Sequence, residues 1–310
     1  MIEAKNLVKR YGSFAAVDHL DFVMEQGRIY GFLGPNGAGK STTMNMITGY
    51  LPPTSGTVLI DGLDIREDSW EARRRIGYLP EIPPVYPDMT PREYLAFAGE
   101  LKGVGKRRLR AEVKRVMEAV EITHMGSRLI RNLSKGYRQR VGFACALLGD
   151  PEVVILDEPT VGLDPRQITQ MRDLIRSLGG EHTVILSSHI LSEVSAVCDH
   201  ILILSKGKLA ASDTPEHLTR RMGRTNVYDL LVDGQPDHIG CLLGQVEGLL
   251  VLETGQDASG LAAVHLETGG DTDPRAQVFR VLAKADCPIM ELTCRTVSLE
   301  DVFLEVTGEE

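Results

Sequence analysis

One segment near the N-terminus has the glycines, the lysine and the hydroxyl groups that a phosphate-binding loop requires. It fits the pattern G-x-x-x-x-G-K-[ST], follows an apolar run that ends at Leu33 and precedes a helix expected over residues 42–48. Strand, loop and helix therefore occur in the order that such a loop needs. The segment consists of Gly34, Pro35, Asn36, Gly37, Ala38, Gly39, Lys40, Ser41 and Thr42.

The residue types of this segment indicate what it would bind. Glycines let the backbone curve closely around a triphosphate, so that several N–H groups point inward, and the following helix adds the positive end of its dipole. Lys40 is expected to hold the β- and γ-phosphates and Ser41 to ligate Mg²⁺. A glycine-rich turn that binds nothing is the alternative, and the complete motif in its strand-to-helix setting argues against it.

A second segment ends an apolar strand, expected over residues 153–156, with two carboxylates. The carboxyl ends of parallel strands form the edge of the sheet where phosphates bind, so both acids are expected there. Asp157 suits Mg²⁺, through a water molecule. Glu158 is expected to act as the base for the attacking water, because phosphoryl transfer depends mainly on alignment and charge stabilisation.

Length and charge limit the possible functions. The chain has 310 residues, 43% of them hydrophobic, which is enough for one large α/β domain and a smaller one. The net charge is −9, and residues 224–310 hold 5 basic and 16 acidic side chains. Such an acidic chain lacks the electrostatic footprint of a nucleic-acid-binding protein, so no nucleic-acid partner is expected. The basic run at residues 106–110 is interpreted as a solvated helix face.

No apolar stretch approaches the roughly 18 to 20 residues that cross a bilayer. The first residues also lack the basic and apolar parts of a secretion signal. We therefore expect a cytoplasmic chain that does not itself span a membrane.

The pattern of strand-like and helix-like segments changes near residues 222–225, which predicts a domain boundary there. Upstream, β-branched runs at residues 31–33, 153–156, 184–187 and 201–204 alternate with amphipathic stretches, which predicts parallel strands covered by helices. Downstream, strands are expected at residues 227–232, 249–254, 261–267 and 288–293, with helices at 236–246 and 274–285 and a closing helix at 299–306. That β-α-β-β-α-β order predicts a small α+β domain of ferredoxin-like type. The predicted domains are residues 1–223 and 224–310.

A phosphate-binding loop alone is also compatible with a GTPase, a kinase or a motor protein. Residues 133–137 distinguish between these protein classes. They read Leu-Ser-Lys-Gly-Tyr, which resembles the LSGGQ signature of the ABC ATPase family with its serine and second glycine kept. Ser134 is expected to cap the helix that follows and so to form an anion site. In that family this site contacts the γ-phosphate of ATP bound to the other subunit. The resemblance therefore implies ATP as the nucleotide and a homodimer or paired cassette, with Ser134 and Gly136 at the shared sites.

Several other individual residues also resemble positions of the ABC ATPase family. Tyr11 resembles the aromatic residue that stacks on adenine, and residues 162–164 resemble the segment that crosses the dimer interface. His189, after the strand at 184–188, resembles the histidine that senses the γ-phosphate. One position departs from the pattern: Glu81 stands where the family usually has the glutamine that ligates Mg²⁺, and a carboxylate can also ligate this ion.

The family resemblance implies a P-loop NTPase core with a mainly parallel sheet, an antiparallel β subdomain and a helical subdomain at about residues 90–135. This short helical segment has the size expected for gripping a membrane partner. Transport through a separate permease, on the inner face of the cytoplasmic membrane, is therefore the favoured function, and a soluble non-transport ABC ATPase is the alternative. Residues 77–81 and 298–303 resemble ABC-2-type exporters, which favours export. The cargo is not encoded in this chain.

Overall fold

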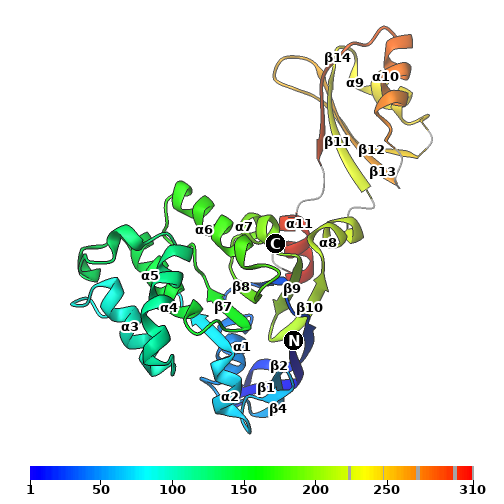
Figure 1. The fold of residues 1–310 in the computed structure, drawn as a ribbon. Coiled ribbons are helices and arrows are strands. Elements are labelled where there is room, and N and C mark those ends of the chain that lie inside the picture. Colours follow the sequence, from blue (N-terminus) through cyan, green and yellow to red (C-terminus); the bar gives the residue numbers. More distant parts are fainter. Residues whose placement is uncertain (223–224, 247, 270–272, 296–298, 309–310) are drawn as a thin grey trace. The chain divides into compact units, whose positions relative to one another are not determined.

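A six-stranded sheet lies in the part of the chain before residue 215 (Figure 1), and the phosphate-binding loop follows its inner strand β3 (Ile29–Leu33). The structure is a computed structural model that describes residues 1–222, 225–246, 248–269, 273–295 and 299–308. It confirms the strands predicted at residues 31–33, 153–156, 184–187 and 201–204. The strands, in spatial order, are β10 (Lys208–Asp213), β9 (His200–Ser205), β3 (Ile29–Leu33), β8 (Thr183–Ser187), β7 (Val153–Asp157) and β6 (Ile76–Leu79). All neighbours are parallel except β9 and β10.

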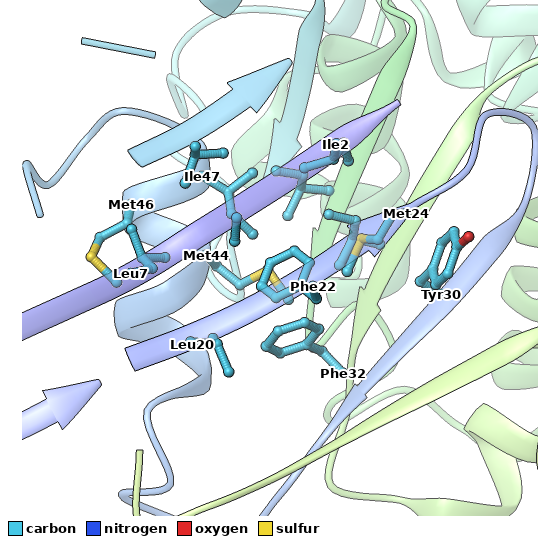
Figure 2. Packing of buried hydrophobic residues seen from close by; sticks show 14 of the residues in the cluster. Ile2, Leu7, Leu20, Phe22, Met24, Tyr30, Phe32, Met44, Met46 and Ile47 are labelled. Carbon is cyan, nitrogen blue, oxygen red and sulfur yellow. The ribbon is translucent and has the colours of Figure 1, made fainter. Parts of the chain in front are cut away.

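An antiparallel sheet packs against the parallel one, as predicted. Its strands, in spatial order, are β2 (Phe14–Met24), β1 (Ile2–Tyr11), β4 (Ser55–Ile60) and β5 (Leu63–Asp64). Figure 2 shows the core between the two sheets, where Phe22 of β2 meets Phe32 of β3 edge-on, with 5.7 Å between the ring centroids. Met44 and Ile47 of α1 (Lys40–Ile47) are buried in the same cluster. The core thereby fixes the helix that follows the phosphate-binding loop.

The other helices up to residue 197 connect or cover these strands, and one more helix, α8, follows β10 along the chain. The predicted helical segment at about 90–135 contains two of them, and none of the helices among the described residues is both long and apolar enough to cross a membrane. The helices are α2 (Ser69–Arg74), α3 (Pro91–Leu101), α4 (Lys106–Ala119), α5 (Lys135–Leu147), α6 (Pro165–Leu178), α7 (Leu191–Val197) and α8 (Pro215–Met222), with 3₁₀ turns η1 (Thr123–Met125) and η2 (Ile130–Asn132).

Caps define the ends of the helices that lead to the signature segment. Thr90 and Glu93 form a reciprocal capping box at the start of α3. The side chain of Lys102, just after α3, donates hydrogen bonds of 2.9, 3.1 and 3.3 Å to the carbonyls of Cys145, Ala146 and Leu148. These carbonyls lie at the end of α5, where backbone donors run out, and the Cys145 carbonyl also accepts from the Leu148 N–H at 3.4 Å. One ammonium group thus supplies donors to all three carbonyls and joins the two helices.

The C-terminal part folds around an antiparallel sheet of its own. The predicted order of strands and helices is confirmed, and α9 and α10 cover one face through Ile239, Leu243, Val278 and Leu282. The elements are β11 (Thr225–Val232), α9 (Pro236–Leu243), β12 (Leu249–Gln256), β13 (Ala262–Gly269), α10 (Arg275–Lys284), β14 (Ile289–Arg295) and the closing helix α11 (Leu299–Thr307). The strand order is β12-β13-β11-β14.

The contacts group the chain into two compact units. One comprises Met1–Pro215 with Glu305–Glu310, and the other comprises Glu216–Leu304. The predicted junction between residues 223 and 224 lies outside the described residues, so the division at that point stays a prediction.

Candidate active site

The phosphate-binding loop is curved around the ammonium group of its own lysine. Lys40 is buried at the first position of α1, and its Nζ donates to the carbonyls of Gly34 and Pro35, the latter at 3.1 Å. Asn36 and Ser41 are exposed, whereas Ala38 and Gly39 are buried; Gly37 is exposed and Thr42 is half-buried. The loop thus holds a cation inside its curve, where the phosphates of a nucleotide would be attracted.

Two glycines of the loop are required by its geometry. Gly39 has φ +101°, and a Cβ placed there would lie 2.5 Å from the carbonyl oxygen of Ala16. Gly34 has φ +154°, and a Cβ there would lie 2.5 Å from the carbonyl oxygen of Leu204. Both values lie outside the backbone region that other residues favour, and both clashes are with backbone atoms. The glycine spacing in the sequence therefore follows from close packing of the loop on β2 and β9.

The strand register brings the loop and the acidic pair to one edge of the sheet. Phe32 of β3 lies opposite Ser187 of β8, and Ser187 lies opposite Asp157 of β7. Since all three strands are parallel, the chain leaves the sheet at this edge after each of them. The two chemical motifs, far apart in the sequence, are therefore neighbours.

Asp157 is held in place by hydroxyl groups from both neighbouring strands. Ser187 Oγ donates to Asp157 Oδ1 at 2.6 Å, and the Tyr78 hydroxyl of β6 lies 3.5 Å from Oδ2. Burial, together with the negative charge of Asp157, raises the pKa of Tyr78 to about 12. Tyr78 thus stays a neutral donor, and the carboxylate of Asp157 has a fixed orientation.

Glu158 differs from Asp157 in its backbone conformation and in its hydrogen-bond partners. Its φ of +48° lies in the left-handed region, which is uncommon for a residue other than glycine and costs on the order of 1 kcal/mol or more. Its N–H donates to the carbonyl of Ser187 at 3.1 Å, and its Oε2 lies 2.9 Å from His189 Nδ1. The Glu158 side chain is largely buried and that of His189 is more than half exposed. A carboxylate and an imidazole that start at adjacent strand ends are thereby paired.

The signature segment lies at the start of α5, against the segment that leads into α6. Ser134 is the N-cap predicted from the sequence, and its Oγ accepts from the Tyr137 N–H at 3.4 Å. A Cβ on Gly136 would meet the amide of Gln167, and a Cβ on Gly162 would meet the ammonium of Lys135. The segment is thus adjacent to residues 162–164, and Asp164 caps α6 through the Gln167 N–H at 2.9 Å.

Two further predicted residues lie at the ends of strands. Tyr11 ends β1 and is 52% exposed, and Lys9 Nζ lies 5.5 Å from the centroid of its ring. Glu81 is exposed and follows β6 by two residues. β6 pairs with β7 so that Leu79 lies opposite Leu156, and Glu81 therefore emerges at the same edge as Asp157.

Comparison with known proteins decides the family. The family model described as "ABC transporter" matches residues 17–161. The bacitracin transport ATP-binding protein BcrA of Bacillus licheniformis is 37% identical over 310 residues, which cover 99% of this chain and 97% of that protein. The chain is an ATP-binding subunit of the ABC transporter family. As a member of this family it binds ATP and is an ABC transporter ATPase.

Further members of the ABC transporter family extend the comparison. The Nod factor export ATP-binding protein I of Burkholderia lata is 31% identical over 100% of this chain and 97% of its own length. A solved ATP-binding subunit of an ABC transporter matches 72% of this chain and 93% of its own, at 30% identity and a TM-score of 0.65. A dimeric ATP-binding cassette bound to ADP and phosphate, described as a post-hydrolysis state, matches 69% of this chain at 26% identity and a TM-score of 0.62. ABC cassettes similar to this chain therefore form dimers.

The sequence did not assign two residues that the structure places at this candidate site. Ser187 and Tyr78 position Asp157, yet each is an ordinary residue within a strand. A polar residue at the end of the otherwise apolar run 184–187 was the available signal for Ser187. Tyr78 lies in the segment 77–81 that resembles ABC-2-type exporters, but that segment does not indicate a contact with Asp157, since the contact depends on β6 and β7 being neighbours.

Proposed function

We propose that this chain hydrolyses Mg²⁺·ATP as a homodimer and so powers export through a separate permease at the inner face of the cytoplasmic membrane. Two relatives that match nearly its whole length are named for bacitracin transport and Nod factor export. These names favour a transporter over a soluble non-transport ABC ATPase. Export rather than import is the direction they support.

In this proposal the phosphate-binding loop, residues 34–42, holds the nucleotide. Lys40 exchanges the carbonyls of Gly34 and Pro35 for the β- and γ-phosphates, which are better acceptors because they carry charge. The loop N–H groups and the start of α1 supply further donors. Tyr11 stacks on adenine, an assignment that its exposed ring permits.

Mg²⁺ is assigned to Ser41, Asp157 and Glu81. The donor set fits this ion, since hydroxyl and carboxylate oxygens are its preferred protein ligands. The oriented carboxylate of Asp157 and the exposed Ser41 and Glu81 are the observations behind the assignment. When bound, Mg²⁺ would neutralise charge on the phosphates.

The contact between Glu158 and His189 is the single observation on which the proposed hydrolysis of ATP depends most. Glu158 would orient the attacking water and accept its proton, while His189, which is exposed and lies 2.9 Å from the carboxylate, would hold it and sense the γ-phosphate. Ser134 and Gly136 of a second copy would complete the site, because a helix N-terminus favours an anion.

We also propose that residues 1–223 form the ATPase domain and residues 224–310 an accessory domain without catalytic groups, which serves dimer contacts or regulation. The order β12-β13-β11-β14, with α9 and α10 on one face, supports a ferredoxin-like assignment for the accessory domain. The helices at about 90–135 would contact the permease.

The decisive experiment uses Glu158→Gln. It keeps the size of the side chain and removes the base, so hydrolysis should slow by roughly 10²- to 10⁴-fold while ATP binding persists. With ATP and Mg²⁺ the variant should accumulate a dimer, measured by size-exclusion chromatography with light scattering. Adding Ser134→Arg should prevent the dimer, because it puts bulk and charge in the interface. Hydrolysis at the wild-type rate in Glu158→Gln would place the base elsewhere.

A further inference from the structure

A groove lies along α3 and α4, away from the residues assigned to ATP. Its volume is about 620 Å³, which is within the range of small-molecule sites. It is called the α3–α4 groove below, and its lining residues are Arg92, Ala96, Lys106, Leu109, Arg110, Val113, Lys114, Met117 and Thr123.

The α3–α4 groove has an apolar floor and a basic rim. Val113 and Met117 are buried in the floor, and Ala96 and Leu109 are half-buried. The rim consists of four exposed cations, and among the residues that the structure describes no carboxylate lines the groove. Those cations are Arg92, Lys106, Arg110 and Lys114.

The structure thus divides the basic run that the sequence placed on a solvated helix face. Lys106 and Arg110 border the α3–α4 groove, whereas Arg107 does not line it and Arg108 lines a different cavity. Lys114 also pairs with Glu118 at 3.6 Å, in a contact that is exposed and therefore weak. An apolar surface bordered by like charges fits an amphiphile with a negative head.

We propose that the α3–α4 groove binds an anionic phospholipid of the cytoplasmic leaflet. The phosphate lies among the rim cations, and part of an acyl chain covers the apolar floor. The inference rests on the proposed function, which brings the subunit to the membrane surface. Basic residues on an amphipathic helix favour such lipids, by about five-fold in affinity for each lysine or arginine near the surface.

The positive charge of the rim favours a lipid over a segment of the permease as the occupant of the α3–α4 groove. Cytoplasmic segments of membrane proteins carry an excess of lysine and arginine, which four rim cations would repel. The cytoplasmic leaflet is itself negative, and its attraction for basic residues extends about 10 Å at moderate salt. The rim of the α3–α4 groove therefore complements the membrane surface better than it complements a basic segment of the permease, and the permease contact proposed above falls on other surfaces of the helices at about 90–135.

Sedimentation of the full chain with vesicles tests the proposal. Wild type should bind vesicles of phosphatidylglycerol mixed with phosphatidylcholine and should not bind phosphatidylcholine alone. Lys106→Gln with Arg110→Gln should weaken binding by about 25-fold, from two contacts of about five-fold each. The matched control is Arg66→Gln with Arg107→Gln, which removes the same charge from exposed residues outside the groove and should retain binding.

A second variant tests the floor. Ala96→Gln fills the α3–α4 groove and leaves every rim charge in place, so it should also lower the affinity for vesicles. Equal losses in the rim variant and its matched control, or full binding by Ala96→Gln, would show general charge attraction and overturn the proposal. So would a rim variant that binds vesicles normally but no longer co-purifies with a permease, since the groove would then hold a protein. ATP hydrolysis by all variants, measured separately without vesicles, reports on the proposed function alone.

Discussion

Ser187 Oγ lies 2.6 Å from Asp157 Oδ1 and donates a hydrogen bond to it, although 30 residues separate the two in the sequence. The serine is buried at the end of β8, and the aspartate ends the adjacent strand β7. A buried donor in a water-poor setting holds a carboxylate in one orientation. Ser187 is therefore the residue that fixes the direction in which Asp157 presents its oxygens.

Ser187→Ala should raise the Mg²⁺ concentration needed for half-maximal ATP hydrolysis by about 10-fold or more. Partners that orient a metal ligand typically contribute 10- to 100-fold to metal affinity. Titration of activity with Mg²⁺ at saturating ATP measures the effect. Ser188→Ala is the control: this serine is also buried, but its hydroxyl accepts from the Ile190 N–H and does not contact Asp157. An equal shift in both variants would contradict the role given to Ser187.

Lys40→Ala should abolish ATP hydrolysis and leave the chain folded. The ammonium of Lys40 contacts two carbonyls of its own loop, so its loss removes charge for the phosphates more than it removes structure. Hydrolysis rate and circular dichroism together check both parts. Unchanged hydrolysis would exclude this loop as the active phosphate site.

Lys102→Met should destabilise the protein by about 1 to 3 kcal/mol, the cost of leaving buried carbonyls without partners. Burial lowers the pKa of Lys102, yet the three carbonyls at the end of α5 favour its charged form. Urea unfolding measures the change in free energy. Lys106→Met makes the same replacement at an exposed position and should cost less than about 0.5 kcal/mol, so similar costs at both sites would refute the capping role.

Tyr78 should ionise near pH 12, above the ordinary range for tyrosine, because burial and Asp157 oppose its charged form. Its folded pKa exceeds its unfolded pKa, so its contribution to stability is complete below about pH 10 and is lost as pH rises toward 12. The difference in absorbance titration at 295 nm between wild type and Tyr78→Phe isolates this group. A difference centred near pH 10 would show that Tyr78 is not buried as described.

Removal of residues 224–310 should leave ATP binding intact if the predicted domain boundary is correct. The compact unit that contains the phosphate-binding loop also includes Glu305–Glu310, so some loss of thermal stability is expected. Nucleotide binding by equilibrium dialysis and thermal unfolding check the two parts. A truncated chain that folds but fails to bind ATP would show that the C-terminal part contributes to the site.

Several features of the site could be predicted because they are encoded by consecutive residues. The loop at 34–42 requires glycine where its backbone meets Ala16 and Leu204, and those requirements appear directly as sequence spacing. The N-cap at Ser134 is equally local, since a capping side chain bonds to a backbone group three residues on. The four strand segments at 31–33, 153–156, 184–187 and 201–204, and the order of strands and helices from β11 to the closing α11, follow from hydrophobic periodicity.

The sequence by itself therefore determined the phosphate-binding loop, the acidic pair and the order of the C-terminal strands and helices, since each depends on neighbours along the chain. Only the tertiary structure decided which residues hold Asp157 and which side chain pairs with Glu158, because Tyr78, Ser187 and His189 reach them through strand order. The same holds for the α3–α4 groove. Its basic rim is visible in the sequence, but its apolar floor exists only where two helices pack side by side, and packing between distant segments leaves no local pattern to read.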